Sequence, residues 1–203
     1  GTTKLVPTTE LGFLDGDMFI ISCQYDQSQV TANSTSIPVT LLSTPLCIDP
    51  KKNEGLTQTK AEPTNPLYSL DKQQSSLVYY DKNTIVLTMP YWVKVTNSSV
   101  EDSELKKHSF VLSYDPTTMK DTDTKLKLYI SHVVDDAGET VTRSNFTYAY
   151  RAYSIRAALT VFKEKTGKLP KYLELTAKTN SSKDELKEES GETSVEYDYA
   201  FTE

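Results

Sequence analysis

The fold of this chain is decided by the stretch from Lys107 to Phe201, whose clearest segment reads KLKLYISHVV over residues 125–134. Leu126, Leu128 and Ile130 alternate there with charged or polar residues. An apolar residue at every second position is typical of a strand with one buried face. The alternation recurs in four further segments, which are residues 108–114, 146–150, 172–179 and 195–201. Their polar opposite faces favour antiparallel strands that keep one face in water.

The period changes between the third and fourth of these strands. Ile155, Leu159 and Phe162 are spaced as one face of a helix, and Gly167 is typical of a helix end. We therefore predict one short helix over about residues 155–165. Together with the strands, it predicts an antiparallel β-sandwich that carries a single helix.

The chain has 203 residues, enough for one large β domain or two smaller ones. A polar, acidic stretch at residues 96–106 separates two alternating regions and favours two domains, 1–104 and 105–203, with a shared sandwich as the alternative. We expect the first to be a small β domain, either a barrel or a sandwich. Within it, residues 49–76 are polar and contain several prolines, which predicts a long mobile loop.

Composition and motifs exclude several classes of function. The net charge of −6 and the absence of a clustered basic face argue against nucleic acid as a partner. No apolar run approaches the roughly 18 residues of a membrane span. Phosphate-binding glycine loops and hydrolase or metalloprotease signatures are also missing, so we expect no cofactor and no enzymatic activity.

His108 and His132 are the two histidines of the chain. A symmetric hairpin pairs Phe110 with Ile130 and places the histidines opposite each other on the apolar face. Two imidazoles without a nearby cysteine or carboxylate make an incomplete metal site. We expect neutral histidines that close one end of the core, with metal chelation as the alternative.

Three aromatic residues and two cysteines are further candidates. Trp92, Tyr129 and Tyr153 lie opposite the apolar faces of their strands, so they either form a platform for sugar rings or pack between domains. Cys23 and Cys47 fall in two predicted strands and are either buried thiols or a disulfide pair.

Several spaced segments resemble one known family. They are KHSFVL at residues 107–112, LKLYISH at 126–132, YSI at 153–155 and YDYAF at 197–201. This pattern resembles the C-terminal half of NigD-like proteins, which are exported Gram-negative lipoproteins with an OB-like N-terminal barrel and a C-terminal β-sandwich. The resemblance implies a cleaved signal peptide, a lipidated cysteine upstream of this sequence, and a place at the outer membrane or cell surface, on the outer or the periplasmic side.

We therefore expect a non-enzymatic lipoprotein of the cell envelope that acts by surface contact with a protein or glycan partner. Two alternatives stay open: a carbohydrate-binding module of a glycan-uptake system, and a hydrolase or metal-dependent enzyme whose site is not recognised. An enzyme should have a deep pocket with convergent polar groups, whereas a contact protein should have a flatter, partly apolar patch.

Overall fold

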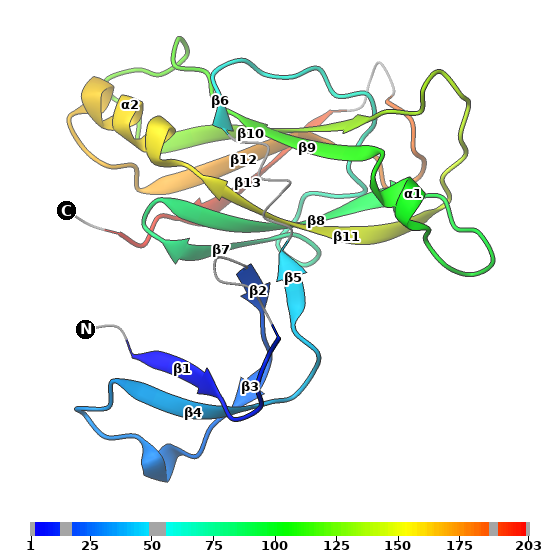
Figure 1. The fold of residues 1–203 in the computed structure, drawn as a ribbon. Helices are drawn as coiled ribbons and strands as arrows, with labels where there is room; N and C mark the ends of the chain where they lie inside the picture. The colour runs from blue at the N-terminus through cyan, green and yellow to red at the C-terminus, as the bar shows by residue number, and fades with distance from the viewer. Residues whose placement is uncertain (1–2, 13–17, 49–55, 187–190, 202–203) are drawn as a thin grey trace. The chain divides into compact units, whose positions relative to one another are not determined.

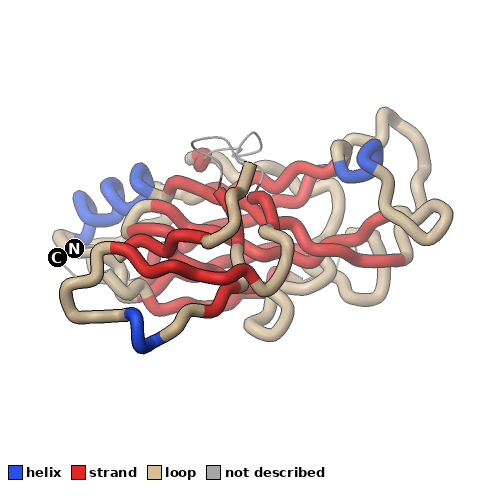
Figure 2. The backbone as a smooth tube through the Cα atoms, turned by 60° about the horizontal axis from the view of Figure 1, so that its bottom comes forward, coloured by secondary structure: helices blue, strands red, loops and turns tan. Residues whose placement is uncertain are grey.

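The computed structural model describes residues 3–12, 18–48, 56–186 and 191–201 (Figure 1). The chain divides into two compact units, Gly1–Lys51 and Lys52–Glu203. Strands make up most of the regular structure in both, which confirms the predicted mainly β fold (Figure 2). Within the described ranges, no helix has the length and apolar character to cross a membrane.

The first unit is built from short strands, which are β1 (Lys4–Pro7), β2 (Met18–Ile20), β3 (Cys23–Gln24), β4 (Ser36–Leu41) and β5 (Leu46–Ile48). β4 is the middle strand of the sheet β1-β4-β3, parallel to β1 and antiparallel to β3. β2 and β5 form a separate antiparallel pair. The sequence also predicts a turn at Asp15-Gly16, which lies outside the described residues. The described strands form a small β domain but no closed barrel, so an OB-like barrel is not confirmed.

The second unit is a two-layer sandwich. Its larger sheet has the order β13-β12-β10-β9-β6, with β6 (Leu56–Thr57), β9 (His108–Ser113), β10 (Lys125–Val134), β12 (Tyr172–Lys178) and β13 (Glu192–Asp198). Its smaller sheet has the order β11-β8-β7, with β7 (Ser76–Asp81), β8 (Thr84–Val93) and β11 (Asn145–Ser154). Figure 1 shows the larger sheet above the smaller one, with α2 (Arg156–Thr166) at one end and α1 (Asp102–Leu105) at the other.

Apolar side chains from both sheets and from α2 fill the space between the layers. Ile85, Phe110, Leu128 and Phe162 are among the fully buried members of this core. The predicted helix is confirmed, and it ends at Gly167, whose φ of 74° is left-handed and whose N–H donates to the Lys163 carbonyl at 2.8 Å.

The larger sheet departs from the prediction in direction and register. β10 pairs in parallel with β12, so the sheet is mixed and not wholly antiparallel. β9 and β10 are antiparallel as expected, but Phe110 pairs with His132 and His108 with Val134, a shift of two residues from the predicted register. Because side chains alternate with a period of two, this shift keeps the same residues on the buried face.

Residues 56–76 are more ordered than the predicted mobile loop. They begin with β6, which pairs with β9, and they bury Leu67 and Leu70 in the core. Apolar residues are few in this segment, but Leu67 and Leu70 are both buried and hold the segment against the sandwich.

The division between the units lies earlier than the predicted boundary at residues 104/105. β7 and β8 precede that boundary, yet β8 pairs along its whole length with β11, which follows it. The polar stretch at residues 96–106 is a connection that leads into α1 between β8 and β9, within one sandwich.

Candidate functional site

One end of the core contains charged and titratable side chains. We call this group the buried charged cluster: Glu104, His108, His132, Asp136, Arg143 and Asp184. Glu104 comes from α1, His108 from the start of β9 and His132 from β10. The two histidines are each 1% exposed, because they continue the inward-facing alternation of their strands.

The two imidazoles form a continuous hydrogen-bonded chain. Nδ1 of His132 lies 3.0 Å from the Pro66 carbonyl oxygen, so it carries hydrogen and donates. Nε2 of His132 then accepts from Nδ1 of His108, at 2.9 Å. This order leaves Nε2 of neutral His108 as an acceptor, 3.2 Å from Oε1 of Glu104. A proton on that nitrogen would turn the contact into an ion pair.

Burial keeps both histidines neutral at ordinary pH. Burial lowers the pKa of His108 to about 4, although the Glu104 carboxylate acts in the opposite direction. Burial and the neighbouring His108 lower the pKa of His132 to about 3. His108 therefore takes up a proton before His132, and only in acid.

Arg143 connects the carboxylates of the cluster. Its side chain is 1% exposed, and its Nε donates to Glu104 at 2.7 Å. Its terminal nitrogens donate to both oxygens of Asp136, at 2.7 and 2.9 Å, and to Asp184 at 3.3 Å. A buried guanidinium needs this many acceptors, because an unpaired charge inside a protein is costly.

The pKa values of these groups follow from the same contacts. Hydrogen bonds from Arg143 lower the pKa of Asp136. Burial alone would raise the pKa of Glu104, but hydrogen bonds from the Lys94 N–H and from Arg143 outweigh it and the pKa falls. Burial raises the pKa of Asp184. The cluster thus holds its charges by mutual pairing, as a structural ion network does.

The cluster reaches the surface at a cavity of about 530 Å³, which we call the Trp92 cavity. Arg143 and Asp184 form part of its wall, and Trp92 forms another part. The remaining lining is rich in hydroxyl and charged groups, from Thr140, Thr142, Ser144, Ser182, Lys183 and Glu185. His108 and His132 do not line it, so neither is placed to exchange a proton with a molecule bound there.

The predicted histidine pair is thus brought together by the structure, at the end of the core. The described residues contain no group of three or more histidine, cysteine or acidic side chains that could hold a metal ion. The nearest carboxylate, Glu104, is occupied by Arg143 and the Lys94 N–H.

The three predicted aromatic candidates do not converge. Tyr153 is fully buried and donates from its hydroxyl to the Phe110 carbonyl at 2.7 Å. Tyr129 lies in the other sheet, under the ammonium of Lys60. Trp92 is 7% exposed, and its indole N–H donates to the Asn180 carbonyl at 2.8 Å.

A different group of rings lies beside Trp92, and we call it the aromatic cluster: Tyr68, Trp92, Phe146 and Tyr148. Tyr68 stacks on Phe146 with ring centroids 4.3 Å apart and meets Trp92 edge-on at 5.0 Å. Phe146 meets Tyr148 edge-on at 5.9 Å. Phe146 and Tyr148 are 41% and 40% exposed, so these rings present faces and edges to solvent.

Sequence reasoning missed this cluster because it assigned the wrong face of β11 to the core. Phe146, Tyr148 and Tyr150 alternate as a buried face would, yet it is Ala149 and Tyr153 on the other face that enter the core. The register of β11 with β8 pairs Phe146 with Trp92 and so places both rings on the outer face. In the sequence, Trp92 falls between the core-facing Tyr91 and Val93, and this position was the signal for an aromatic residue on the outer face.

Cys23 and Cys47 are both free thiols. They lie in β3 and β5, and Cys47 is exposed while Cys23 is partly exposed. The structure therefore shows neither the predicted disulfide nor the predicted buried pair.

These features define a class: a mainly β protein with a small N-terminal unit and a β-sandwich that carries a surface cavity and an exposed aromatic cluster. Comparison with solved structures finds the same fold in other proteins. A crystal structure of a "putative lipoprotein" from Bacteroides fragilis matches with a TM-score of 0.76 and 30% identity, over 99% of this chain and 90% of that one. The chain therefore belongs to the family of this Bacteroides lipoprotein.

Two further structures share the fold at low identity. An uncharacterized protein from Parabacteroides merdae matches with a TM-score of 0.58 and 15% identity, over 97% of this chain and 89% of that one. A protein of unknown function, DUF1344, from Bacteroides vulgatus matches with a TM-score of 0.52 and 7% identity, over 98% and 80%. No protein-family model matches the sequence, so the NigD-like resemblance is not confirmed. No curated protein matches it either.

Proposed function

We propose that this protein is a lipid-anchored component of the bacterial cell envelope that binds a glycan, without catalysing a reaction on it. The observation that carries the proposal is the aromatic cluster, in which Phe146 and Tyr148 are each about two-fifths exposed. Aromatic faces pack against the apolar faces of sugar rings, and the Tyr148 hydroxyl adds a polar group at the edge of the cluster.

The Trp92 cavity supports the same partner. Trp92 belongs to both features, since it contacts Tyr68 and lines the cavity. A sugar stacked on the exposed rings therefore has a neighbouring recess of about 530 Å³ for the next residue of the chain. The hydroxyl groups of Thr140, Thr142 and Ser144 both donate and accept, as sugar hydroxyls require.

A non-enzymatic role is supported by the ion pairs that hold the buried charged groups at the cavity. Arg143 and Asp184 are the buried charges in its wall, and Arg143 is held by three carboxylates. A general acid or base must be able to exchange a proton with its substrate. The histidines that could do so lie inside the core, behind these ion pairs.

Titration of the protein with a panel of neutral oligosaccharides tests the proposal. We expect saturable binding that the double variant Phe146→Ala/Tyr148→Ala weakens at least tenfold, because stacking contributes on the order of 1 kcal/mol per ring. Tyr80→Ala is the matched control, since Tyr80 is 70% exposed but lies on β7, outside the cluster. Equal loss in the control, or binding that survives in the double variant, would remove the aromatic cluster from the glycan site.

Lipid attachment is tested separately, by mass spectrometry of the native protein recovered from the envelope of its own organism. A diacylglyceryl group on an N-terminal cysteine is expected. Recovery of an unmodified protein from the soluble fraction would contradict the anchored location, while leaving glycan binding to its own test.

A further inference from the structure

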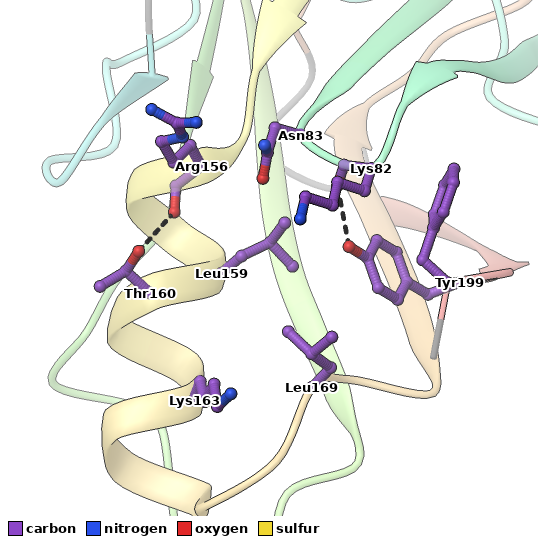
Figure 3. A pocket seen from close by; sticks show the side chains of 9 residues that line it. Lys82, Asn83, Arg156, Leu159, Thr160, Lys163, Leu169 and Tyr199 are labelled. Carbon is purple, nitrogen blue, oxygen red and sulfur yellow. Dashed lines mark hydrogen bonds between the residues drawn. The ribbon is translucent and has the colours of Figure 1, made fainter. Parts of the chain in front are cut away.

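A second cavity lies in the sandwich unit, away from the aromatic cluster. It has a volume of about 610 Å³, within the range of small-molecule sites, and we call it the α2 cavity. Figure 3 shows Leu159 and Lys163 reaching from α2 toward Lys82, Leu169 and Tyr199 on the facing side. None of these residues takes part in the proposed glycan site.

One part of the lining is apolar and firmly packed. Leu159 and Tyr199 are only 5% and 7% exposed, and Leu169 and Phe201 complete this surface. The rings of Tyr199 and Phe201 lie 5.5 Å apart. A ligand that enters the cavity therefore meets two aliphatic side chains and two rings, which favour an apolar body.

Hydrogen bonds fix the walls of the cavity to each other. The Tyr199 hydroxyl donates to the Lys82 carbonyl at 2.8 Å (Figure 3). The Ile155 N–H donates to the Asn83 carbonyl at 2.7 Å, so the start of α2 is tied to the same turn between β7 and β8. These hydrogen bonds tie α2 and the segment after β13 to the turn between β7 and β8, and the cavity lies between these three parts.

The other part of the lining is cationic. Lys82, Arg156 and Lys163 bring three positive side chains to one cavity of a protein whose net charge is −6. Among the described residues, neither Lys82 nor Arg156 forms an ion pair, whereas Lys60 and Lys125 elsewhere in the unit pair with glutamates.

Asp81 is an acidic group whose charge interacts with Arg156. A hydrogen bond from the Asn83 N–H lowers the pKa of Asp81, and Arg156 contributes a smaller lowering through its charge. Asp81 does not line the cavity. The cavity therefore presents the positive charges of Lys82 and Arg156 next to an apolar surface, and an anion with an apolar body satisfies both.

From this juxtaposition we infer that the α2 cavity binds a small organic carboxylate with an apolar body. The carboxylate pairs with Lys82 and Arg156, which supply charge-assisted hydrogen bonds. The body packs on Leu159, Leu169 and the Tyr199 ring. Inorganic anions leave the apolar surface bare and neutral apolar molecules leave the cations unpaired, so both should bind more weakly.

Calorimetric titration with octanoate tests the inference, with acetate as the anion that lacks a body and 1-octanol as the body that lacks a charge. We expect octanoate to bind saturably in the low millimolar range or tighter, and the other two at least tenfold more weakly. The double variant Lys82→Gln/Arg156→Gln should lose at least tenfold in octanoate affinity. The matched control is Lys127→Gln/Lys171→Gln, which removes two exposed lysines outside the cavity and should bind as the unaltered protein does.

Methyl and ring NMR shifts locate the bound molecule, and they keep the test independent of whether the variants fold well. Octanoate should move the signals of Leu159, Leu169 and Tyr199 and leave those of Phe146 and Tyr148 unchanged. The inference is overturned by the absence of saturable octanoate binding, by equal binding to the charge-neutralised variant, or by shifts confined to other surfaces. A failure here leaves the glycan site untouched, because the two sites share no residue.

Discussion

Acid should destabilise the sandwich unit through its two buried imidazoles. The perturbation is a change from about pH 7 to about pH 5, which protonates histidines in the unfolded chain but not in the folded one. Burial lowers the pKa of His108 to about 4 and that of His132 to about 3, from an ordinary value of 6.5. The unfolded state therefore binds more protons as the pH falls below 6.5, and folding stability falls with it.

The size of the effect follows from these pKa values. At pH 5 an imidazole with a pKa of 6.5 is almost fully protonated, whereas one with a pKa of about 4 or below is almost fully neutral. The free energy of unfolding should therefore fall by about 2 kcal/mol per histidine, or about 4 kcal/mol for both. The depressed pKa of Glu104 keeps it ionised in this window, while Asp184, whose pKa is raised by burial, acts in the opposite direction to the histidines.

Urea unfolding at the two pH values measures the effect, and a variant assigns it. His132→Gln keeps a donor for the Pro66 carbonyl and an acceptor for His108 but removes one titratable group. The loss between pH 7 and pH 5 should shrink in this variant by about half. Equal stability of the unaltered protein at both pH values, or an imidazole that titrates near 6.5 by NMR, would refute the reasoning.

Three further changes probe single contacts, each by urea unfolding. Glu104→Gln should cost about 2–4 kcal/mol, because it removes a carboxylate that accepts from the buried Arg143 guanidinium; a loss below 1 kcal/mol would mean that Arg143 does not depend on it. Tyr153→Phe should cost about 1–2 kcal/mol, since it leaves the buried Phe110 carbonyl without its hydroxyl donor, and an unchanged midpoint would contradict that hydrogen bond. Gly167→Ala should cost about 1 kcal/mol through the left-handed φ of 74°, and a stabilised variant would show that α2 ends elsewhere.

The structure was predicted best from the sequence where the pattern within one strand or helix was enough to identify it. In β10, Leu126, Leu128 and Ile130 alternate with polar residues, and all three are buried as predicted. The helix at Arg156–Thr166 is equally local, because its apolar spacing and its terminal glycine are both contained in the segment. These elements needed no knowledge of what packs against them.

The predictions that were wrong concern which strand faces and segments pack against each other. In β11 both faces carry apolar or aromatic residues, so alternation alone could not show that Phe146 and Tyr148 face outward. The register of β9 and β10 depends on a long connection that imposes no symmetric turn. Leu67 and Leu70 are isolated in a polar segment, and only the tertiary fold shows that they enter the core.

The candidate site was harder to predict from the sequence than the fold. Arg143 and Asp184 are 41 residues apart, and the contacts of Arg143 with Glu104, Asp136 and Asp184 depend on how α1 and two loops converge. The two histidines could be paired from the sequence because they share one face of neighbouring strands. Glu104 comes from the four-residue helix α1, and Arg143 and Asp184 come from loops. Such short or irregular segments carry no periodic pattern from which their proximity could be predicted.

The central claim, that a glycan binds at the aromatic cluster and the adjoining cavity, is tested most directly by the fluorescence of Trp92. It is the single tryptophan of the chain, it contacts Tyr68, and it lines the cavity. A glycan bound there should change the Trp92 emission saturably, at the same concentrations as the calorimetric titration, and the change should be lost in Phe146→Ala/Tyr148→Ala. Glycan binding that leaves the Trp92 emission unaltered would contradict this location, and a panel that produces neither heat nor fluorescence change would contradict glycan binding itself.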